Sequence, residues 1–255
     1  MTIGFIGTGT ISGAMAEGLQ RLPDPPAVFV SPRSEVVSSR LAALHPNVRR
    51  ATSNAEVAAE ADIVVLGMRP TQVEDALEGI SFRHDQIVLS LVAGLSLAEV
   101  QQLAPQSRVD RAIPMPGIAR AAGPILVYPG LPETVALLSP LGDLVACTAE
   151  AQLTMGGLTG FMSAYFELQH TLIERAVSAG VGRDEARKYV LSLLAMLSGT
   201  ANLTSPEHFD GLVVEHQTKG GLNERVRRHL LDAGWFDGPG KAFDEIARLR
   251  RENLE

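Results

Sequence analysis

Residues 3–14 of the chain read IGFIGTGTISGA. A short apolar run, Ile3 to Ile6, leads into Gly7-Thr8-Gly9, and residues suited to a helix follow at once. In a strand-turn-helix unit the first glycine permits a tight turn and the second lets the backbone approach a pyrophosphate, whose charge the helix start then attracts. The third glycine of the G-x-G-x-x-G pattern is Ser12 here. The segment predicts a dinucleotide-binding loop, and a glycine-rich turn without a ligand is the alternative.

The chain around this loop alternates short apolar runs with amphipathic stretches. Runs of Val, Ile and Leu with few polar residues are typical of strands in a parallel sheet that is covered on both faces. The expected strands are 3–6, 27–30, 63–66, 87–91 and 109–113, with a further strand at 125–128 toward the sheet edge. The expected helices between them are 12–21, 34–44, 54–60, 71–78 and 96–103. This order predicts an α/β fold, an N-terminal Rossmann domain with a doubly wound parallel sheet over residues 1–148.

The pattern changes after residue 148. Residues 150–179 carry apolar side chains at helical spacing without proline, and Gly180-Val181-Gly182 is a natural helix stop. Further helices are expected at 183–198, 222–233 and 240–251, with Pro206 in a first helical turn. The sequence therefore predicts an all-helical C-terminal domain over 149–255. Its hydrophobic segments, such as 189–197, favour a substrate and dimerisation domain, and hence a homodimer or higher homo-oligomer.

Composition narrows the function classes. The 255 residues carry a formal net charge of −7, which disfavours nucleic acid as a partner. Cys147 is the single cysteine, so no disulfide forms within the chain, as suits a reducing cytoplasm. We expect no secretory signal, because a basic n-region and an apolar h-region are lacking, and no membrane span, because the apolar runs are short. The histidines share no metal-ligand spacing, so no metal site is expected.

The end of the second expected strand bears on the choice of cofactor. It reads Val30-Ser31-Pro32-Arg33-Ser34. An NAD-preferring site usually has Asp or Glu here to hold the ribose hydroxyls. With no carboxylate, and with Arg33 between hydroxyl-bearing residues, the loop suits a 2′-phosphate. The prediction is NADP(H) rather than NAD(H), and an ordinary solvated loop is the alternative.

The motifs together resemble those of the pyrroline-5-carboxylate reductases, in order over nearly the whole chain. Residues 4–9 look like the opening strand and loop of that family, and Ser31 to Ser34 is similar to its Asn-Arg-Ser/Thr segment at the adenosine phosphate. Residues 61–70, ADIVVLGMRP, resemble its "ADvvilavKP" strand with Arg69 in place of lysine, and residues 90–97, SLVAGLSL, resemble "SiaAGisl". Loop and resemblance together indicate these cofactor-binding residues: Gly7, Thr8, Gly9, Thr10, Ile11, Ser31, Arg33, Ser34, Met68, Arg69, Pro70, Ala93 and Gly94.

The substrate segments depart from the family. Its "RxMPNTP" reads RAIPMPG at 111–117, its "SGSGPAY" reads TGFMSAY at 159–165, and its "VTSPGGTT" reads HQTKGGLN at 216–223. The glycines that precede a helix remain, so a carboxylate could sit on free amides there, with an interhelix turn as the alternative. The substrate-binding candidates are Met115, Tyr165, Gly220, Gly221 and Leu222, and the catalytic candidates are Thr218, Lys219 and Asn223.

The resemblance implies an oxidoreductase that uses NADPH to reduce a cyclic imine, by default 1-pyrroline-5-carboxylate to proline. Because Met115, Pro116 and Leu222 remove polar groups that the family has near its substrate, a different imine is also a candidate. Two other readings stay open. One is a dehydrogenase of a ketone or 3-hydroxy acid, since the β-hydroxyacid dehydrogenases share the two-domain layout. The other is a non-catalytic dinucleotide sensor or interaction protein.

Overall fold

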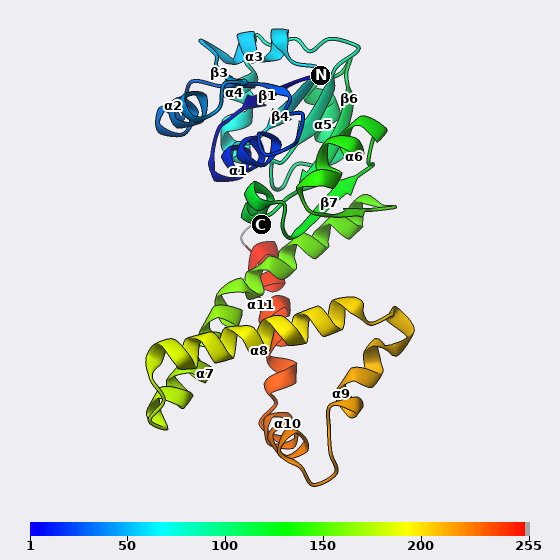
Figure 1. Cartoon of the computed structure of the whole chain (residues 1–255). Coiled ribbons are helices and arrows are strands. Elements are labelled where there is room, and N and C mark those ends of the chain that lie inside the picture. The colour runs from blue at the N-terminus through cyan, green and yellow to red at the C-terminus, as the bar shows by residue number, and fades with distance from the viewer. Residues whose placement is uncertain (253–255) are drawn as a thin grey trace. The chain divides into compact units, whose positions relative to one another are not determined.

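A computed structural model describes residues 1–252 of the chain. It divides into two compact units, residues 1–156 and residues from 157 onward, whereas the sequence placed the boundary between 148 and 149. Figure 1 shows the ribbon of both units, and each unit is described by itself.

An eight-stranded sheet forms the centre of the first unit, in the order β3-β2-β1-β4-β5-β6-β7-β8. Neighbouring strands run parallel except β6 and β7, which are antiparallel. The strands are β1 (Thr2–Ile6), β2 (Ala27–Val30), β3 (Val48–Arg50), β4 (Ile63–Leu66), β5 (Ile87–Ser90), β6 (Arg108–Ile113), β7 (Pro124–Tyr128) and β8 (Asp143–Ala146). β1, β4 and β5 are buried along almost their full length, as their apolar sequences predict. The doubly wound sheet is confirmed.

Helices cover both faces of this sheet and give two apolar clusters. One cluster joins α1, α2 and α6 to the sheet through residues such as Met15, Leu41 and Leu138. The other joins α3, α4 and α5 through Val57, Val73 and Val100. The helices and short 3-10 segments are α1 (Thr10–Leu19), α2 (Glu35–Leu44), α3 (Asn54–Glu60), η1 (Pro70–Gln72), α4 (Val73–Leu77), α5 (Leu97–Leu103), η2 (Pro116–Arg120), α6 (Pro132–Leu138) and η3 (Ser139–Leu141).

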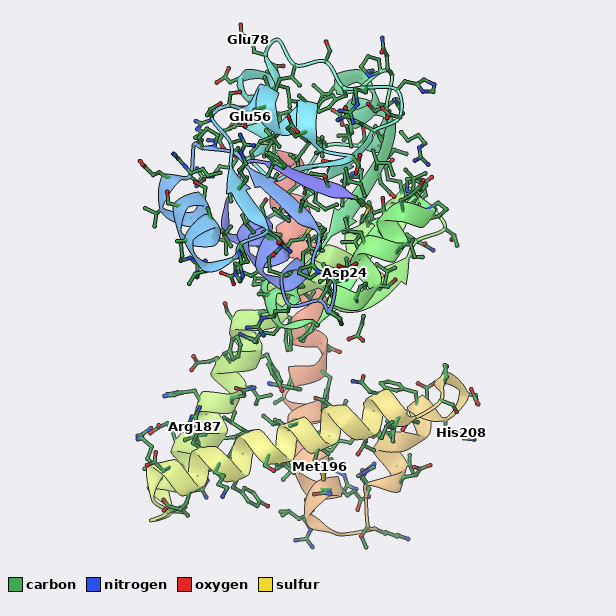
Figure 2. The ribbon with its side chains drawn as sticks, turned by 45° about the horizontal axis from the view of Figure 1, so that its top comes forward. Asp24, Glu56, Glu78, Arg187, Met196 and His208 are labelled. Carbon is green, nitrogen blue, oxygen red and sulfur yellow. The ribbon has the colours of Figure 1, made fainter. Side chains whose placement is uncertain are left out.

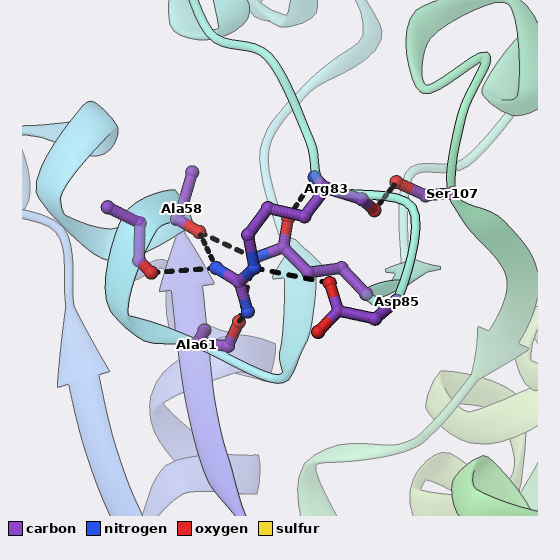
Figure 3. A network of polar contacts seen from close by, with 7 residues as sticks. Ala58, Ala61, Arg83, Asp85 and Ser107 are labelled. Carbon is purple, nitrogen blue, oxygen red and sulfur yellow. Dashed lines mark hydrogen bonds and ion pairs between the residues drawn. The ribbon is translucent and has the colours of Figure 1, made fainter.

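Arg83, in the loop before β5, lies against the C-terminal end of α3 (Figure 3), and Gln86 bonds to the same helix end. The Arg83 guanidinium donates to the carbonyls of Ala59 at 2.7 Å and Ala61 at 3.1 Å. The buried Gln86 amide donates to the carbonyls of Ala58 at 2.6 Å and Ala61 at 2.7 Å. The last carbonyls of a helix have no amide donor within the helix, and the Arg83 and Gln86 side chains supply donors to them. These bonds tie the end of α3 to the segment that leads into β5.

Several elements differ from the sequence-based prediction. β3, α6 and the edge strand β8 were not expected. The strand expected at 125–128 is β7, and it lies toward the sheet edge as predicted, next to β8. The first part of the long helix expected at 150–179 is instead a 3-10 segment, η4 (Glu150–Phe161). It contains Gly156, Gly157 and Gly160, and glycine is a poor α-helix former.

The second unit is helical, and the side chains it buries are few. Of its described side chains, residues 157–248, those of Ala186 and Val190 are buried, and large apolar groups such as Met196 on α8 are exposed (Figure 2). Its elements are α7 (Met162–Ser178), α8 (Arg183–Leu203), η5 (Pro206–Gly211), α9 (Leu212–Glu215), α10 (Leu222–Asp232), η6 (Trp235–Asp237) and α11 (Gly238–Glu252). None of the described helices has the length and apolar character that crossing a membrane requires.

Candidate dinucleotide site

A cavity of about 570 Å³ opens at the carboxyl edge of the sheet in the first unit. It lies beyond the ends of β1, β2 and β4, where ligands bind in open α/β sheets. Its lining residues are Gly7, Thr8, Gly9, Thr10, Ile11, Ser12, Ser31, Arg33, Ser34, Asn54, Gly67, Met68, Arg69, Gln72, Ala76 and Leu91. The structure therefore gathers most of the residues that the sequence assigned to a cofactor.

The glycines of the loop between β1 and α1 have two distinct roles. Gly7 has a φ of +86°, and a Cβ there would lie 2.6 Å from the Gly67 carbonyl oxygen, so neither backbone nor space admits a side chain. Gly9 has an ordinary φ of −80°, and a Cβ on it would meet no atom closer than 3.9 Å. Gly7 thus serves the fold, while Gly9 leaves open the face that a bound group would approach.

The N-terminus of α1 offers unpaired donors at this face. Its first intrahelical bond runs from the Gly13 amide to the Gly9 carbonyl at 2.8 Å, so the amides of Thr10, Ile11 and Ser12 have no acceptor within the helix. The N-cap Gly9 has no side chain to satisfy them. In addition, the buried Ser12 hydroxyl has no hydrogen-bond partner. Free amides and a helix dipole attract an anion, so this end of the cavity suits a phosphate or pyrophosphate.

Ser31 joins the loop to the end of β2. Its hydroxyl accepts a hydrogen bond from the Gly7 amide at 3.0 Å and lies 3.2 Å from the hydroxyl of Thr8. Thr8 also donates to the Ser31 carbonyl at 3.3 Å, and both side chains are fully buried. The two residues therefore hold the glycine loop rather than present hydroxyls to a ligand.

The cavity carries positive charge without a compensating acid. Arg33 and Arg69 line it, and neither forms an ion pair with a carboxylate among the described residues. No Asp or Glu belongs to the described lining. Arg50 braces the loop from outside, where it donates to the Pro32 carbonyl at 3.1 Å and the Ser38 hydroxyl at 3.1 Å. A phosphate at the end of β2 would be attracted here, whereas a ribose diol would find no carboxylate to accept its hydrogen bonds.

Some cavity residues were not expected from the sequence, and some expected residues lie elsewhere. Asn54 and Gln72 come from the start of α3 and from η1, and Asn54 also donates to the Ala76 carbonyl at 2.9 Å. The signal that could have found Asn54 is its place at a helix start on the carboxyl side of β3. Pro70, Ala93 and Gly94 do not line the cavity. Ala93 and Gly94 belong to the loop between β5 and α5, which continues the same edge of the sheet.

The substrate and catalytic candidates of the second unit gather at the turn before α10. Gly221 is the N-cap, and its amide donates to the Thr218 carbonyl at 2.7 Å. The Gly220 amide donates to the Glu224 carboxylate at 2.5 Å. The Asn223 amide group donates to the His216 carbonyl at 2.8 Å, and Leu222 is exposed. Two of the amides expected to hold a substrate carboxylate thus have acceptors within the turn.

The remaining candidates are placed on other elements. Tyr165 lies half-buried on α7, next to the ring of Phe166. Met115 belongs to the first unit, where it is the N-cap of η2. No group of three or more His, Cys, Asp and Glu side chains in the part of the chain that the structure describes is arranged to hold a metal ion.

Comparison with known proteins bears on this geometry. The family model described as "NADP oxidoreductase coenzyme F420-dependent" matches residues 2–94, which include the glycine loop. A pyrroline-5-carboxylate reductase of Pisum sativum is 26% identical over 247 residues, covering 93% of this chain and 90% of that protein. The chain is thus similar to pyrroline-5-carboxylate reductases over nearly its whole length.

Solved structures show the same fold over the whole chain. The 1-pyrroline-5-carboxylate reductase of Streptococcus pyogenes superposes with a TM-score of 0.80 at 20% identity, over 96% of each chain. The pyrroline carboxylate reductase of Plasmodium falciparum, solved with NADP bound, superposes with a TM-score of 0.77 at 16% identity, over 96% of this chain and 95% of that one. The α/β sheet with a C-terminal helical region is therefore the fold of this reductase family.

Proposed function

We propose that the chain is an NADPH-dependent reductase of a cyclic imine, and that it accepts 1-pyrroline-5-carboxylate, the substrate in the names of its relatives, less efficiently than a less polar or differently shaped imine. The observation that carries the proposal is the cavity with Arg33 and Arg69 and no acidic lining residue, in a chain that aligns with these reductases over 93% of its length. The family is one of oxidoreductases that act on C=N bonds, so a dehydrogenase of hydroxy acids and a non-catalytic sensor are not favoured.

The residues present fit NADP(H). The amides of Thr10, Ile11 and Ser12 would hold the pyrophosphate, and Arg33, with Ser34 beside it, would hold the 2′-phosphate. When bound, the nicotinamide supplies a hydride to the imine carbon. Reduction of C=N to CH–NH also requires a proton at nitrogen. We assign proton donation and substrate orientation to the turn before α10, with Thr218, Lys219 and Asn223 as the candidate groups.

The substrate-binding candidates of this proposal are Met115 in the first unit and Tyr165, Gly220, Gly221 and Leu222 in the helical unit. The amides of Leu222 and Asn223, at the first positions of α10, have no intrahelical acceptor because the ladder starts with the Arg225 amide bonded to the Gly221 carbonyl. They are the available donors for a substrate carboxylate. The single cysteine and the reducing cofactor suit a cytoplasmic enzyme.

We further propose that the active form is a homodimer or higher homo-oligomer built through the helical unit. Large apolar side chains of this unit are exposed, among them Leu203 at 91% and Val214 at 71%. Apolar surface on this scale marks an interface in a soluble protein, and a second copy of the chain offers the same surface. Sedimentation should give at least twice the monomer mass. The variant L203E should lower it, whereas V36E, at an exposed valine of α2, should not.

The function is tested by the decay of NADPH absorbance when the purified chain and NADPH are mixed with 1-pyrroline-5-carboxylate, 1-pyrroline or piperideines, and by the rise of NADPH absorbance when the chain and NADP⁺ are mixed with a set of 3-hydroxy acids. Turnover of a cyclic imine with formation of the matching amine supports the proposal. Turnover confined to hydroxy acids would replace it with the dehydrogenase function. NADPH binding without any turnover would replace it with a sensor.

A further inference from the structure

One glutamate oxygen joins three elements beside the loop between β5 and α5. Glu150, the first residue of η4, accepts a hydrogen bond from the Arg111 guanidinium at 2.5 Å and from the Leu97 amide at 2.6 Å, both on Oε1. Leu97 is the first residue of α5 and Arg111 belongs to β6. All three residues lie in the first unit. This contact set thus fixes the C-terminal end of the Leu91–Ser96 loop against β6.

The Arg111–Glu150 pair differs from the other ion pairs of the described chain in its burial. The Arg111 side chain is 13% exposed and that of Glu150 33%. A charge-assisted bond away from solvent is stronger and geometrically stricter than a surface pair, and loss of one partner leaves the other desolvated. Arg111 also faces Glu99, which caps α5 through Ser96; the Ser96 hydrogen bonds and then the Arg111 charge hold the pKa of Glu99 below its ordinary value. Arg111 therefore faces two carboxylates that fasten the same loop.

The position of this loop relative to the cavity gives the contact set a functional meaning. In a sheet of order 3-2-1-4-5-6, one half of a dinucleotide lies over the first three strands and the other over β4, β5 and β6. The cavity covers the ends of β1, β2 and β4 and reaches Leu91, the first residue after β5. The other half of a bound dinucleotide would therefore be expected over the Leu91–Ser96 loop and the end of β6, where Arg111 pairs in register with Ser90.

We infer that Arg111 and Glu150 are positioning residues for the reactive half of the cofactor: they hold the Leu91–Ser96 loop in place and do not contact the substrate. This inference rests on the proposed function. Hydride transfer is sensitive to small displacements, and a shift of about 1 Å can lower a rate about 100-fold. Loss of the pair should therefore reduce kcat and the affinity for the whole dinucleotide, while the binding of its adenosine half stays unchanged.

The test compares R111Q and E150A with the wild-type chain in calorimetric titrations. Adenosine 2′,5′-bisphosphate, which occupies only the cavity lined by Arg33, should bind all three proteins with equal affinity. NADPH should bind the two variants at least 3-fold more weakly, and kcat with the best imine should fall by about 10- to 100-fold. The variant E150Q keeps an oxygen that accepts from Leu97 and Arg111, so it should recover most of the E150A loss.

The matched control is R108Q. Arg108 lies at the amino end of the same strand and forms a two-bond pair with Glu133 at 2.8 and 3.2 Å, but it is far along β6 from the open edge. R108Q should leave kcat and both affinities unchanged. Equal loss of affinity for adenosine 2′,5′-bisphosphate and NADPH, or an unchanged kcat in folded R111Q and E150A, would overturn the inference. If R111Q does not fold, the affinities and kcat of E150A and E150Q test the inference instead. A wild-type chain that binds NADPH but reduces no imine would refute the proposed function. The comparison of NADPH affinity with adenosine 2′,5′-bisphosphate affinity in the variants would still test the role of the Arg111–Glu150 pair.

Discussion

The hydroxyl of Ser31 accepts a hydrogen bond from the amide of Gly7 at 3.0 Å, across the two strands that frame the glycine loop. The Ser31 side chain is buried and Gly7 is half-buried, and this hydroxyl is the acceptor that the structure gives to the Gly7 amide. The bond connects the glycine loop, where a pyrophosphate would bind, with the segment after β2, where a 2′-phosphate would bind.

Replacement of Ser31 by alanine should therefore affect both stability and cofactor affinity. The Gly7 amide would be left without an acceptor, at a cost of about 1–3 kcal/mol. We expect S31A to unfold at lower temperature and to bind NADPH more weakly, measured by thermal denaturation with and without cofactor. S39A, at an exposed serine of α2, is the control. An S31A protein with wild-type melting and NADPH affinity would contradict the role given to this hydrogen bond.

Arg33 should determine the preference for NADPH over NADH. A charge-assisted bond to the 2′-phosphate contributes about 1–3 kcal/mol. R33A should therefore weaken NADPH binding by roughly 5- to 150-fold and leave NADH binding unchanged, as measured by titration calorimetry. R40A is the matched control because Arg40 is exposed and pairs with Glu17 outside the cavity. Equal wild-type affinities for the two cofactors would refute the preference.

Substitutions at the two loop glycines should affect different properties: cofactor binding at Gly9 and stability at Gly7. G9V should fold, because Gly9 has an ordinary φ and room for a Cβ, yet it should lose NADPH binding since the side chain blocks the approach of the pyrophosphate. G7A should instead lower the melting temperature, because its Cβ would meet the Gly67 carbonyl oxygen at 2.6 Å. Calorimetric titration with NADPH and thermal denaturation followed by circular dichroism separate the outcomes. Normal NADPH binding by G9V would show that the loop does not hold the cofactor.

The departures at Met115, Pro116 and Leu222 should make 1-pyrroline-5-carboxylate a poor substrate. Each lost donor costs about 1–3 kcal/mol of transition-state binding unless another group replaces it. We expect less polar or differently shaped imines to have the higher kcat/KM. L222T should raise kcat/KM for 1-pyrroline-5-carboxylate by about 10-fold and leave that for uncarboxylated 1-pyrroline unchanged. Wild-type turnover of 1-pyrroline-5-carboxylate at or above about 10⁴ M⁻¹s⁻¹ would contradict this expectation.

The sequence predicts the parts of the fold whose local signal matches their tertiary role. β1, β4 and β5 are buried on both faces and so are continuously apolar, and α3 has the expected bounds because Ser53 caps it and Ala61 ends it. β3 was not predicted because two of its three residues are exposed arginines. α6 was not predicted because it begins at a proline, in a segment whose apolar residues do not recur at helical spacing.

The candidate site was predictable where chain-local motifs form it. The glycine loop and Arg33 are adjacent to the strands that place them. Asn54, Gln72 and the Arg111–Glu150 pair are brought to the same edge only by the sheet, across sequence separations that no local pattern spans. The Glu224 bond to Gly220 likewise depends on the φ of +73° at Gly220, which sequence alone does not give.

All the lining residues of the cavity precede residue 156, where the first unit ends. Mutations that accumulate in the helical unit therefore change none of the side chains that line it. A protein of this fold can therefore keep the same reducing cofactor while substitutions in its helical unit change which compounds it reduces.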